Sequence, residues 1–401
     1  MSERCEPDCD HICSGSRAPR MEASTTTMIR RRSMLRFEFR GAAVTVALGL
    51  ASQCALATNG DQMTALSAPT AAMGGATIVA PRDALTVLYN PAGVAELVGS
   101  SETGGLNAIR MDFGFGLLSP PRKVNGNESD SNLYMMPSGA VVFHVNPRLF
   151  VGMGMGGVSG MGVNVPDVSP MPGNQPISTT KQVFRLSPAA ALRVNDKLTI
   201  GGSLNIGYQS IALSTPAFAL PQNQQFGFGA SVGAIYKISD SLQTGFTYIS
   251  KLDIKDMTFN TTAGKVSFDM DMPAMYGIGL AFRPREDLLV EFDIKRIQFS
   301  DVMDSITVSS PGAPYPPALK FGWDDQTVYA LGIRKIMNPK TTLLAGFNYG
   351  KSPIESADVP NNLGSTAVVE KHLSIGVTRK WSNHVRSNFA YTHAFNNKVT
   401  S

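Results

Sequence analysis

The residues best suited to metal binding or nucleophilic catalysis are few. Cys5, Cys9, Cys13 and His11 have the residue types of a metal site. They stand in a short polar stretch ahead of a basic and then apolar segment, which favours a discarded leader over a metal site. The remaining histidines have no serine and aspartate partners at a spacing that indicates a catalytic triad, and no G-x-S-x-G motif occurs. The sequence therefore predicts no enzyme, no metal site and no cofactor.

A glycine pattern matches a dinucleotide fingerprint in spacing only. Gly152, Gly154 and Gly157 spell G-x-G-x-x-G, which needs a helix to follow directly. The following residues include Gly162 and several prolines from Pro166 onward, which cannot form that helix. Glycines inside a strand mark bulges or bends instead.

The composition favours a membrane barrel. Of the 401 residues, 43% are hydrophobic and only 16% are charged, whereas soluble domains carry about 25% charge. Mean hydropathy is near zero, at −0.02, because lipid-facing and lumen-facing residues of such a barrel alternate and cancel. The net charge is +4, with no basic run outside the N-terminal region, which gives no reason to predict nucleic-acid binding.

The N-terminal region has the three parts of an export signal. A basic start at Arg30–Arg32 precedes a small apolar stretch at 41–51, which is too short to span a bilayer. Ala55-Leu56-Ala57 is an A-x-A cleavage site, so we predict a signal peptide at 28–57 that ends at Ala57. Residues 1–27 are then a leader or a wrongly assigned start. A lipoprotein anchor at Cys54 is the less favoured alternative.

The rest of the chain alternates apolar and polar residues with the period of two that strands require. Ile200 and Leu204 fall on one face, and Thr199 and Asn205 on the other. Thirteen strands are predicted, at 102–118, 133–145, 148–160, 181–194, 197–211, 225–238, 241–259, 265–284, 287–300, 324–337, 340–351, 367–381 and 384–396.

The predicted connections alternate in length. Tight turns such as Asn146-Pro147 and Asn195-Asp196 alternate with long polar stretches. The long stretches are 119–132, 161–180, 212–224, 301–323 and 352–366. Short periplasmic turns opposite long external loops are typical of outer-membrane barrels, whereas a soluble β-sandwich, the alternative, needs no such asymmetry.

Motifs at both ends of the chain carry a family resemblance. The runs Ala71–Ala76 and Tyr89–Gly93, with Asp83-Ala84 between them, resemble the N-terminal hatch of the FadL/TodX family of outer-membrane transporters. Asn348–Ile354 and Tyr391–Phe395 resemble its later strands. The hatch motif proper is Asn90, Pro91, Ala92 and Gly93.

The resemblance implies a monomeric, transmembrane antiparallel β-barrel of fourteen strands with the hatch as a plug in the lumen. We assign residues 58–101 to the hatch and 102–401 to the barrel. Because only thirteen strands are counted, we expect the last strand to lie beyond this sequence. The implied location is the outer membrane of a Gram-negative bacterium, in contact with bilayer and lipopolysaccharide after insertion by the barrel-assembly machinery.

The implied function is passive uptake of long-chain fatty acids or other hydrophobic compounds by lateral diffusion through the barrel wall. The alternatives are uptake of aromatic or alkane hydrocarbons, and a general porin or structural barrel. A porin has no hatch ahead of its first strand, so the hatch motif argues against it. The sequence leaves the substrate open.

Three sets of residues are candidates for ligand handling. The implied lateral opening is an inward kink of the third strand, and its predicted residues are Gly154, Gly156, Gly157 and Gly160. Apolar residues of an external loop that could capture the ligand are Leu213, Phe218 and Leu220. Arg185 and Lys251, on the inward phase of their strands, are candidates to bind a ligand carboxylate in an apolar pocket, although a salt bridge within the wall is the plainer interpretation.

Overall fold

The structure, a computed structural model, describes residues 46–47, 58–97, 109–169, 175–215, 219–261, 264–312 and 315–401. The chain divides into two compact units, Met1–Arg40 and Gly41–Ser401, and all described residues belong to the second. The predicted leader, and the predicted signal peptide apart from Val46 and Ala47, lie outside the described residues.

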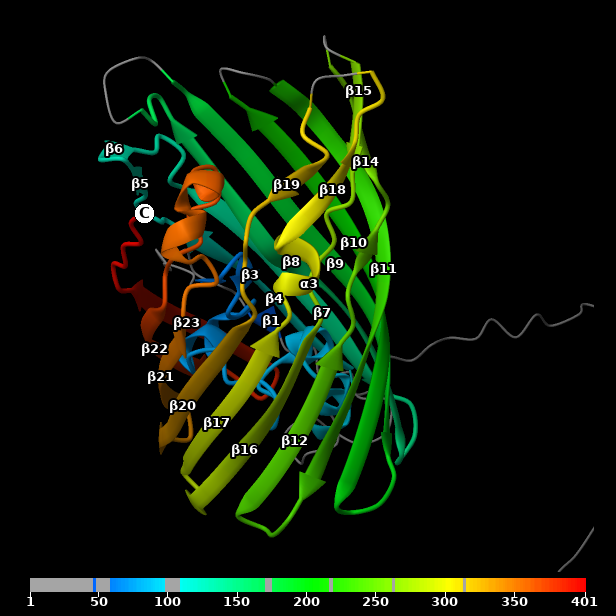
Figure 1. Cartoon of the computed structure of the whole chain (residues 1–401). Helices are drawn as coiled ribbons and strands as arrows, with labels where there is room; N and C mark the ends of the chain where they lie inside the picture. The colour runs from blue at the N-terminus through cyan, green and yellow to red at the C-terminus, as the bar shows by residue number, and fades with distance from the viewer. Residues whose placement is uncertain are drawn as a thin grey trace, which may run out of the picture. The chain divides into compact units, whose positions relative to one another are not determined.

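The unit is built on one curled antiparallel sheet (Figure 1). The sheet has 17 strands, of which β1 (Val46–Ala47), β2 (Thr58–Asn59), β3 (Gln62–Met63) and β13 (Asp253–Ile254) have two residues each. The others form the wall: β4 (Ile109–Leu118), β7 (Tyr134–His144), β8 (Leu149–Val165), β9 (Ile177–Arg193), β10 (Leu198–Ser214), β11 (Ala219–Lys237), β12 (Leu242–Ile249), β16 (Met275–Arg285), β17 (Leu288–Ile297), β20 (Gln326–Asn338), β21 (Thr341–Gly350), β22 (Lys371–Lys380) and β23 (Val385–Ala394).

Each wall strand pairs antiparallel with the next one along the chain. The predicted all-β antiparallel fold is therefore confirmed, and the described residues hold the thirteen wall strands that the alternation predicted. At the edges, β23 pairs in parallel with β1, and no pairing within the described residues joins β4 to β23.

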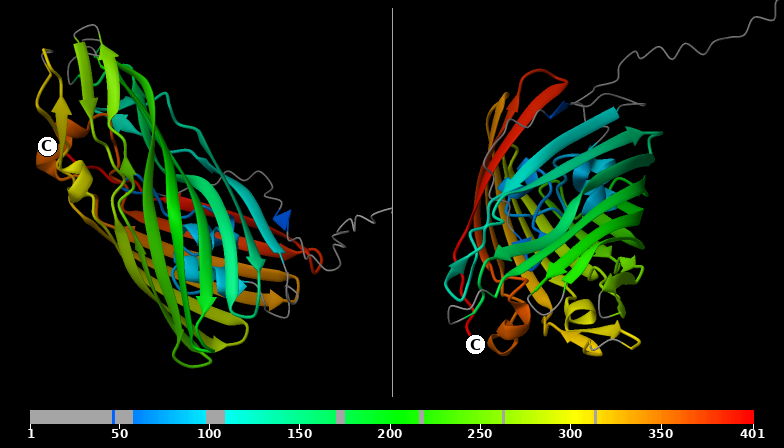
Figure 2. Two further views of the ribbon diagram at one scale, coloured as in Figure 1. Left: turned by 90° about the vertical axis from the view of Figure 1, so that its right-hand side faces the viewer. Right: turned by 90° about the horizontal axis from the view of Figure 1, so that it is seen from above.

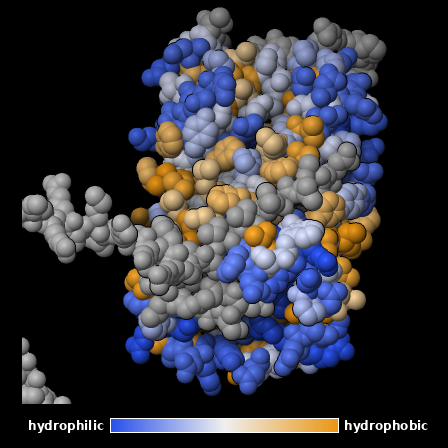
Figure 3. All heavy atoms as spheres, turned by 180° about the vertical axis from the view of Figure 1, so that it is seen from behind, coloured by the Kyte–Doolittle hydropathy of each residue, from blue (hydrophilic) through white to orange (hydrophobic). Residues whose placement is uncertain are grey.

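The two faces of the wall differ as the alternation predicts. In β10, Ile200 and Leu204 are 42% and 66% exposed, whereas Thr199 and Asn205 are 3% and 2% exposed. On the face shown in Figure 3, apolar atoms gather between two polar ends. The apolar side faces outward and the polar side faces the lumen, which is the arrangement that lipid requires.

The lumen is occupied by the N-terminal segment, by which we mean residues 58–97 (Figure 2). Its elements after the β2–β3 hairpin are α1 (Ala68–Ala72), the 3-10 helices η1 (Ala84–Leu88) and η2 (Pro91–Gly93), and α2 (Val94–Leu97). A capping box between Ser67 and Thr70 starts α1. Most residues of this segment are buried.

Small residues let the segment approach the wall closely. A Cβ added at Gly346 of β21 would overlap the backbone of Met73 and Gly74, and one at Gly201 of β10 would overlap that of Pro91 and Ala92. Glycine is therefore required at these wall positions because backbone lies where a side chain would project.

An external sheet stands above the wall and was not predicted. It contains β14 (Met257–Thr261), β15 (Gly264–Phe268), β18 (Ser305–Ser309) and β19 (Ala318–Lys320), with α3 (Ser300–Met303) beside it. The predictions of unbroken strands at 241–259 and 265–284, and of a plain loop at 301–323, are wrong. Pairing with β11 is interrupted after Ile249 and resumes at β13, and the chain leaves the wall beyond Ile254. Its alternation continues there because β14 and β15 bury Met257, Phe259 and Phe268 in an apolar cluster.

The remaining external elements are short. They are the hairpin strands β5 (Lys123–Val124) and β6 (Asn127–Glu128) and the 3-10 helix η3 (Ser356–Asn362). Among the described residues, no helix has both the length and the apolar character needed to cross a membrane.

The close contact at Gly346 gives a test of the packing between the segment and the wall. Gly346→Ala is expected to lower the temperature at which the folded protein loses its fast migration on SDS gels, because the new Cβ displaces the Met73–Gly74 backbone. Gly114→Ala in β4 is the matched control, since its Cβ would meet only Ser138 Oγ at 3.8 Å. Equal transition temperatures for the two variants would show that the segment is not packed against β21.

Candidate functional site

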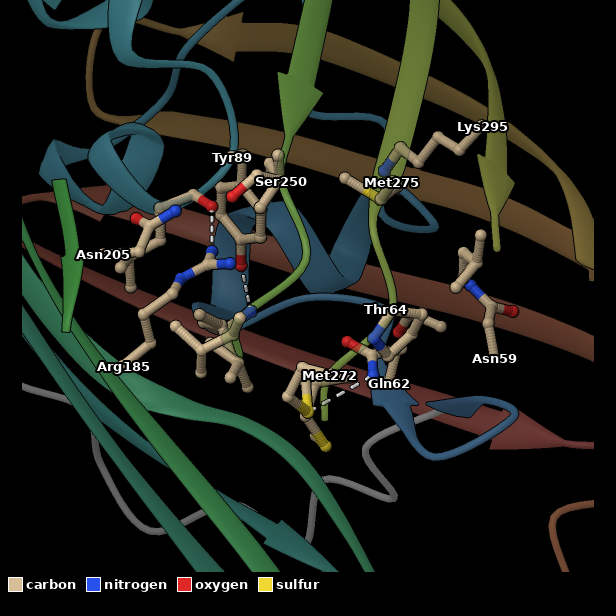
Figure 4. A pocket seen from close by; sticks show the side chains of 18 residues that line it. Asn59, Gln62, Thr64, Tyr89, Arg185, Asn205, Ser250, Met272, Met275 and Lys295 are labelled. Atoms are coloured by element: carbon tan, nitrogen blue, oxygen red, sulfur yellow. Dashed lines mark hydrogen bonds between the residues drawn. The ribbon is translucent and has the colours of Figure 1, made fainter. Parts of the chain in front are cut away.

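An inner cavity of about 70 Å³ lies between the N-terminal segment and the wall (Figure 4). The segment contributes Leu66, Leu88 and Tyr89, and the wall side contributes Val158, Ile249 and Ile297. Most of the exposed lining is apolar, with a few polar side chains among it, as is usual for sites that bind apolar small molecules.

Arg185 of β9 supplies positive charge to the inner cavity. Its guanidinium points toward Tyr89 in Figure 4 and donates to the backbone oxygen of Leu88. Its Nε has no hydrogen-bond partner, and among the described residues no carboxylate forms an ion pair with it. A guanidinium that lines a mostly apolar cavity can donate hydrogen bonds to the carboxylate of a ligand.

Tyr89 lies beside Arg185 and is held by the segment itself. The backbone amide of Leu66 donates to the Tyr89 hydroxyl. Burial raises the pKa of the Tyr89 phenol above its usual range, so it remains neutral. Tyr89 therefore carries no negative charge that could pair with Arg185.

Lys251 does not lie on the inward phase of a strand, so its predicted placement is wrong. It follows the end of β12, its side chain is 47% exposed, and it forms an ion pair with Asp271. The hydrogen bond from Lys251 to Asp271 raises the pKa of the lysine. Its neighbour Leu252 lines the inner cavity instead. The prediction counted the alternation through residues 250–251, where the strand has ended.

The third wall strand, β8, is irregular where the glycines predict a bend. Its pairing with β9 shifts register between Gly157 and Ser159, and its pairing with β7 ends at Gly156. Beyond that point Ser159 is paired with Gln62 of β3. The wall strand has therefore exchanged its neighbour β7 for the N-terminal hairpin.

The four predicted glycines divide between the regular and irregular parts of β8. Gly154 and Gly156 pair regularly with β7, and a Cβ on either would lie about 3.3 Å from the nearest side chain. Gly157 borders the register shift, and Gly160 lies beyond it. Only the last two stand at the irregularity.

A second cavity, the wall cavity, lies at this irregularity and has a volume of about 240 Å³. It is lined by Met135, Met136, Gly160 and Lys181 from the wall, and by Met63 from the hairpin. Met135 is 66% exposed on the outer face. Met63 lines the inner cavity as well, so the hairpin stands between the two cavities.

The Asn90–Gly93 motif fastens the segment to the opposite side of the wall. The Asn90 Oδ1 accepts from Ala92 N at 3.1 Å, and its Nδ2 donates to Ile78 O at 2.7 Å and to Phe246 O of β12 at 3.3 Å. Pro91 begins η2, where the lack of an amide proton costs nothing. The motif is therefore structural. It joins two parts of the N-terminal segment, at Ile78 and Asn90, and attaches both to β12.

Sequence reasoning missed a set of charged residues on β17. Glu291 accepts from Val79 N and Ala80 N at 2.9 and 3.1 Å, and Asp293 accepts from Thr77 N and Ile78 N at 2.6 and 3.1 Å. Lys295 donates to Gly75 O, and Arg82 forms an ion pair with Glu291. Charged residues at every second position of a strand were the available signal.

The predicted capture residues do not form an exposed apolar surface. Leu220 is only 5% exposed and belongs to the buried cluster under the external sheet. Leu213 packs against the same cluster. Phe218 lies outside the described residues, as do Cys5, Cys9, Cys13 and His11. Within the described ranges, no group of metal-ligating residues is arranged to hold an ion.

A wall of antiparallel strands with an apolar outer face and a polar inner face is the arrangement of the outer-membrane β-barrel class. The chain belongs to the family of outer membrane protein transport proteins (OMPP1/FadL/TodX), whose model matches residues 48–401. This is a family of Gram-negative outer-membrane transporters for hydrophobic compounds.

Solved structures share the fold at low sequence identity. The toluene transporter TbuX of Ralstonia pickettii is 21% identical, with a TM-score of 0.68 over 83% of this chain and 94% of that one. A Pseudomonas aeruginosa FadL homologue is 14% identical, with a TM-score of 0.66 over 84% and 91%. The Pseudomonas putida toluene transporter TodX is 21% identical, with a TM-score of 0.64 over 85% and 95%. No curated protein matches the sequence.

The Asn90 contacts predict a loss of stability on substitution. Asn90→Ala leaves the buried Ile78 carbonyl without its partner, and the free energy of unfolding is expected to fall by about 1–3 kcal/mol. Urea unfolding in detergent micelles measures this change. Gln224→Ala, which removes an exposed amide from β11, is the control; a fall of the same size there would rule out a special role for the motif.

Proposed function

We propose that this protein takes up hydrophobic compounds passively across the outer membrane. The ligand enters the inner cavity, which has to widen from about 70 Å³ to hold it, and leaves sideways through the wall at β8. The observation that carries the proposal is the pair of cavities on either side of the β2–β3 hairpin, one inside the lumen and one reaching the outward residue Met135. A compound that partitions poorly into water gains from such a sequence of apolar sites.

In this proposal residues 58–97 act as a hatch. They fill the lumen, which argues against a general porin, because a porin needs an open aqueous path. The protein works as a monomer in contact with the bilayer and lipopolysaccharide, after insertion by the barrel-assembly machinery. Capture at the cell surface is assigned to no particular residue, because Leu220 is buried.

Long-chain fatty acids are the first candidate substrate. The reason is Arg185, a cation that lines the mostly apolar inner cavity and has no ion pair with any carboxylate of the described residues. A carboxylate needs a charge-assisted hydrogen bond when it leaves water, and an alkyl chain needs apolar surface. Arg185 and the lining residues offer both.

Aromatic hydrocarbons are the second candidate, and they fit equally well. Met272 and Met275 line the inner cavity, and thioether side chains pack favourably on aromatic rings. TbuX and TodX, which share the fold, are described as toluene transporters.

Arg185 allows the two substrates to be distinguished. Arg185→Met is expected to lower the rate of oleate uptake by intact cells roughly tenfold, which corresponds to one lost charge-assisted hydrogen bond, and to leave toluene uptake unchanged. Lys251→Met, which removes a cation outside the inner cavity, is the matched control. Unchanged oleate uptake in Arg185→Met would exclude the carboxylate contact. Equal uptake of both compounds with and without the gene would exclude the transport function.

We also propose that a signal peptide is removed after Ala57. The reason is the A-x-A run Ala55-Leu56-Ala57, which directly precedes Thr58, the first residue of β2. N-terminal sequencing of the protein from purified outer membranes is expected to begin at Thr58. A start at Cys54 carrying lipid would instead indicate a lipoprotein.

A further inference from the structure

The β2–β3 hairpin is tied to the wall by one buried carboxylate. The Asp61 Oδ2 accepts from Lys181 Nζ at 2.8 Å and from Ser159 Oγ at 2.9 Å. The side chains of Asp61 and Lys181 are 1% and 3% exposed. A single group therefore joins the hairpin to two wall strands, β8 and β9.

Backbone contacts place this carboxylate at the irregular part of β8. Gly160 N donates to Asp61 O at 3.0 Å, and Gln62 is paired with Ser159. Lys181 stands opposite Met161 in the pairing of β8 with β9. The β8 residues in these contacts, Ser159, Gly160 and Met161, come after the register shift. In that stretch β8 is no longer paired with β7.

The other contacts of the hairpin with the wall are few. Its two strands pair through two residue pairs, and its pairing with β8 is a single pair. A two-residue turn with Gly60 at φ +59° closes it. So short a hairpin is not stable by itself. Gly60 packs closely on Phe299 and Trp323, and the ion pair between Asp61 and Lys181 is the one charged contact that the described residues give the hairpin with the wall.

The hairpin also separates the two cavities. Met63 lines both of them, and Lys181 lines the wall cavity. Displacement of the hairpin away from β8 would remove the partition and join the inner cavity to the wall cavity.

We propose that Asp61, Ser159 and Lys181 form a latch that holds the hairpin against β8, and that release of this latch sets the rate at which the inner cavity opens into the wall cavity. The proposal rests on the proposed transport function, because the rate matters only if a ligand passes. The three side chains are positioning residues, since they act through the hairpin and need not touch the ligand.

Opening of the hairpin can be measured without any ligand. Asn59 is 6% exposed, so a cysteine in its place reacts with a maleimide only when the hairpin moves. The reporter is Asn59→Cys in the full chain with its four native cysteines changed to serine, studied in isolated outer membranes.

Removal of the latch is expected to accelerate labelling. Asp61→Asn, Lys181→Met and the double variant should each label roughly tenfold faster, and the double variant no faster than the faster single variant, because both changes remove one interaction. Lys181→Arg keeps the charge and should label close to the wild-type rate. Lys123→Met with Glu128→Gln breaks an exposed ion pair whose side chains are 61% and 73% exposed, and is the matched control.

Folding is checked separately by the migration of each variant on SDS gels before heating. If a single variant does not fold, the exchanged pair Asp61→Lys with Lys181→Asp is used. Labelling of that pair at the wild-type rate supports the latch, and fast labelling overturns it. Unchanged labelling in folded Asp61→Asn and Lys181→Met also overturns it.

Uptake of labelled toluene and oleate by intact cells separates the latch from the transport function. Faster labelling together with faster uptake supports both proposals. Faster labelling with wild-type uptake shows that the latch does not set the rate and overturns the proposal. A third outcome is that the latch variants label faster but cells with and without the gene take up both compounds equally. That outcome supports the hairpin latch and overturns the transport function.

Discussion

The structure depends on the contact between two buried carboxylates and four consecutive backbone amides. Glu291 and Asp293 face a lumen that is filled by protein, where an ionised carboxylate without partners is very costly. The amides of residues 77–80 form no secondary structure of their own and would also be unsatisfied. Each set of groups therefore needs the other, and together they fix the middle of the N-terminal segment on β17.

The rest of the interior follows from this attachment. With residues 75–82 fixed, Asn90 reaches back to Ile78 and across to β12, which places Leu88 and Tyr89 at one side of the inner cavity. The Leu88 carbonyl then receives a hydrogen bond from Arg185. The orientation of Arg185 in the inner cavity is thus determined by contacts that begin on β17.

The period-two alternation predicted the wall because burial on one face of each strand selects it directly. It could not predict where a strand leaves the wall, because Met257 and Phe259 keep the same alternation inside the external cluster. Lys251 was misplaced because the register of the chain against β11 shifts by one residue between Ile249 and Asp253, which the alternation does not show. Glu291 and Asp293 were visible as charges on the inward phase of a strand, but their partners lie 212 and 216 residues earlier in the sequence, and a carboxylate paired with backbone amides leaves no side-chain pattern to find.

The two ends of the N-terminal segment are held with very different strength, and the wall explains why that difference is tolerated. Residues 75–97 have many buried polar contacts, whereas the polar contacts of the hairpin at 58–63 with β8 and β9 centre on Asp61 and one paired residue. A wall strand cannot leave its backbone groups unpaired toward lipid. Because β8 loses β7 beyond Gly156, the hairpin is the element that satisfies it there. A displacement of the hairpin would leave these groups of β8 without a partner, so an arrangement with the hairpin away from β8 is higher in free energy than the one seen here.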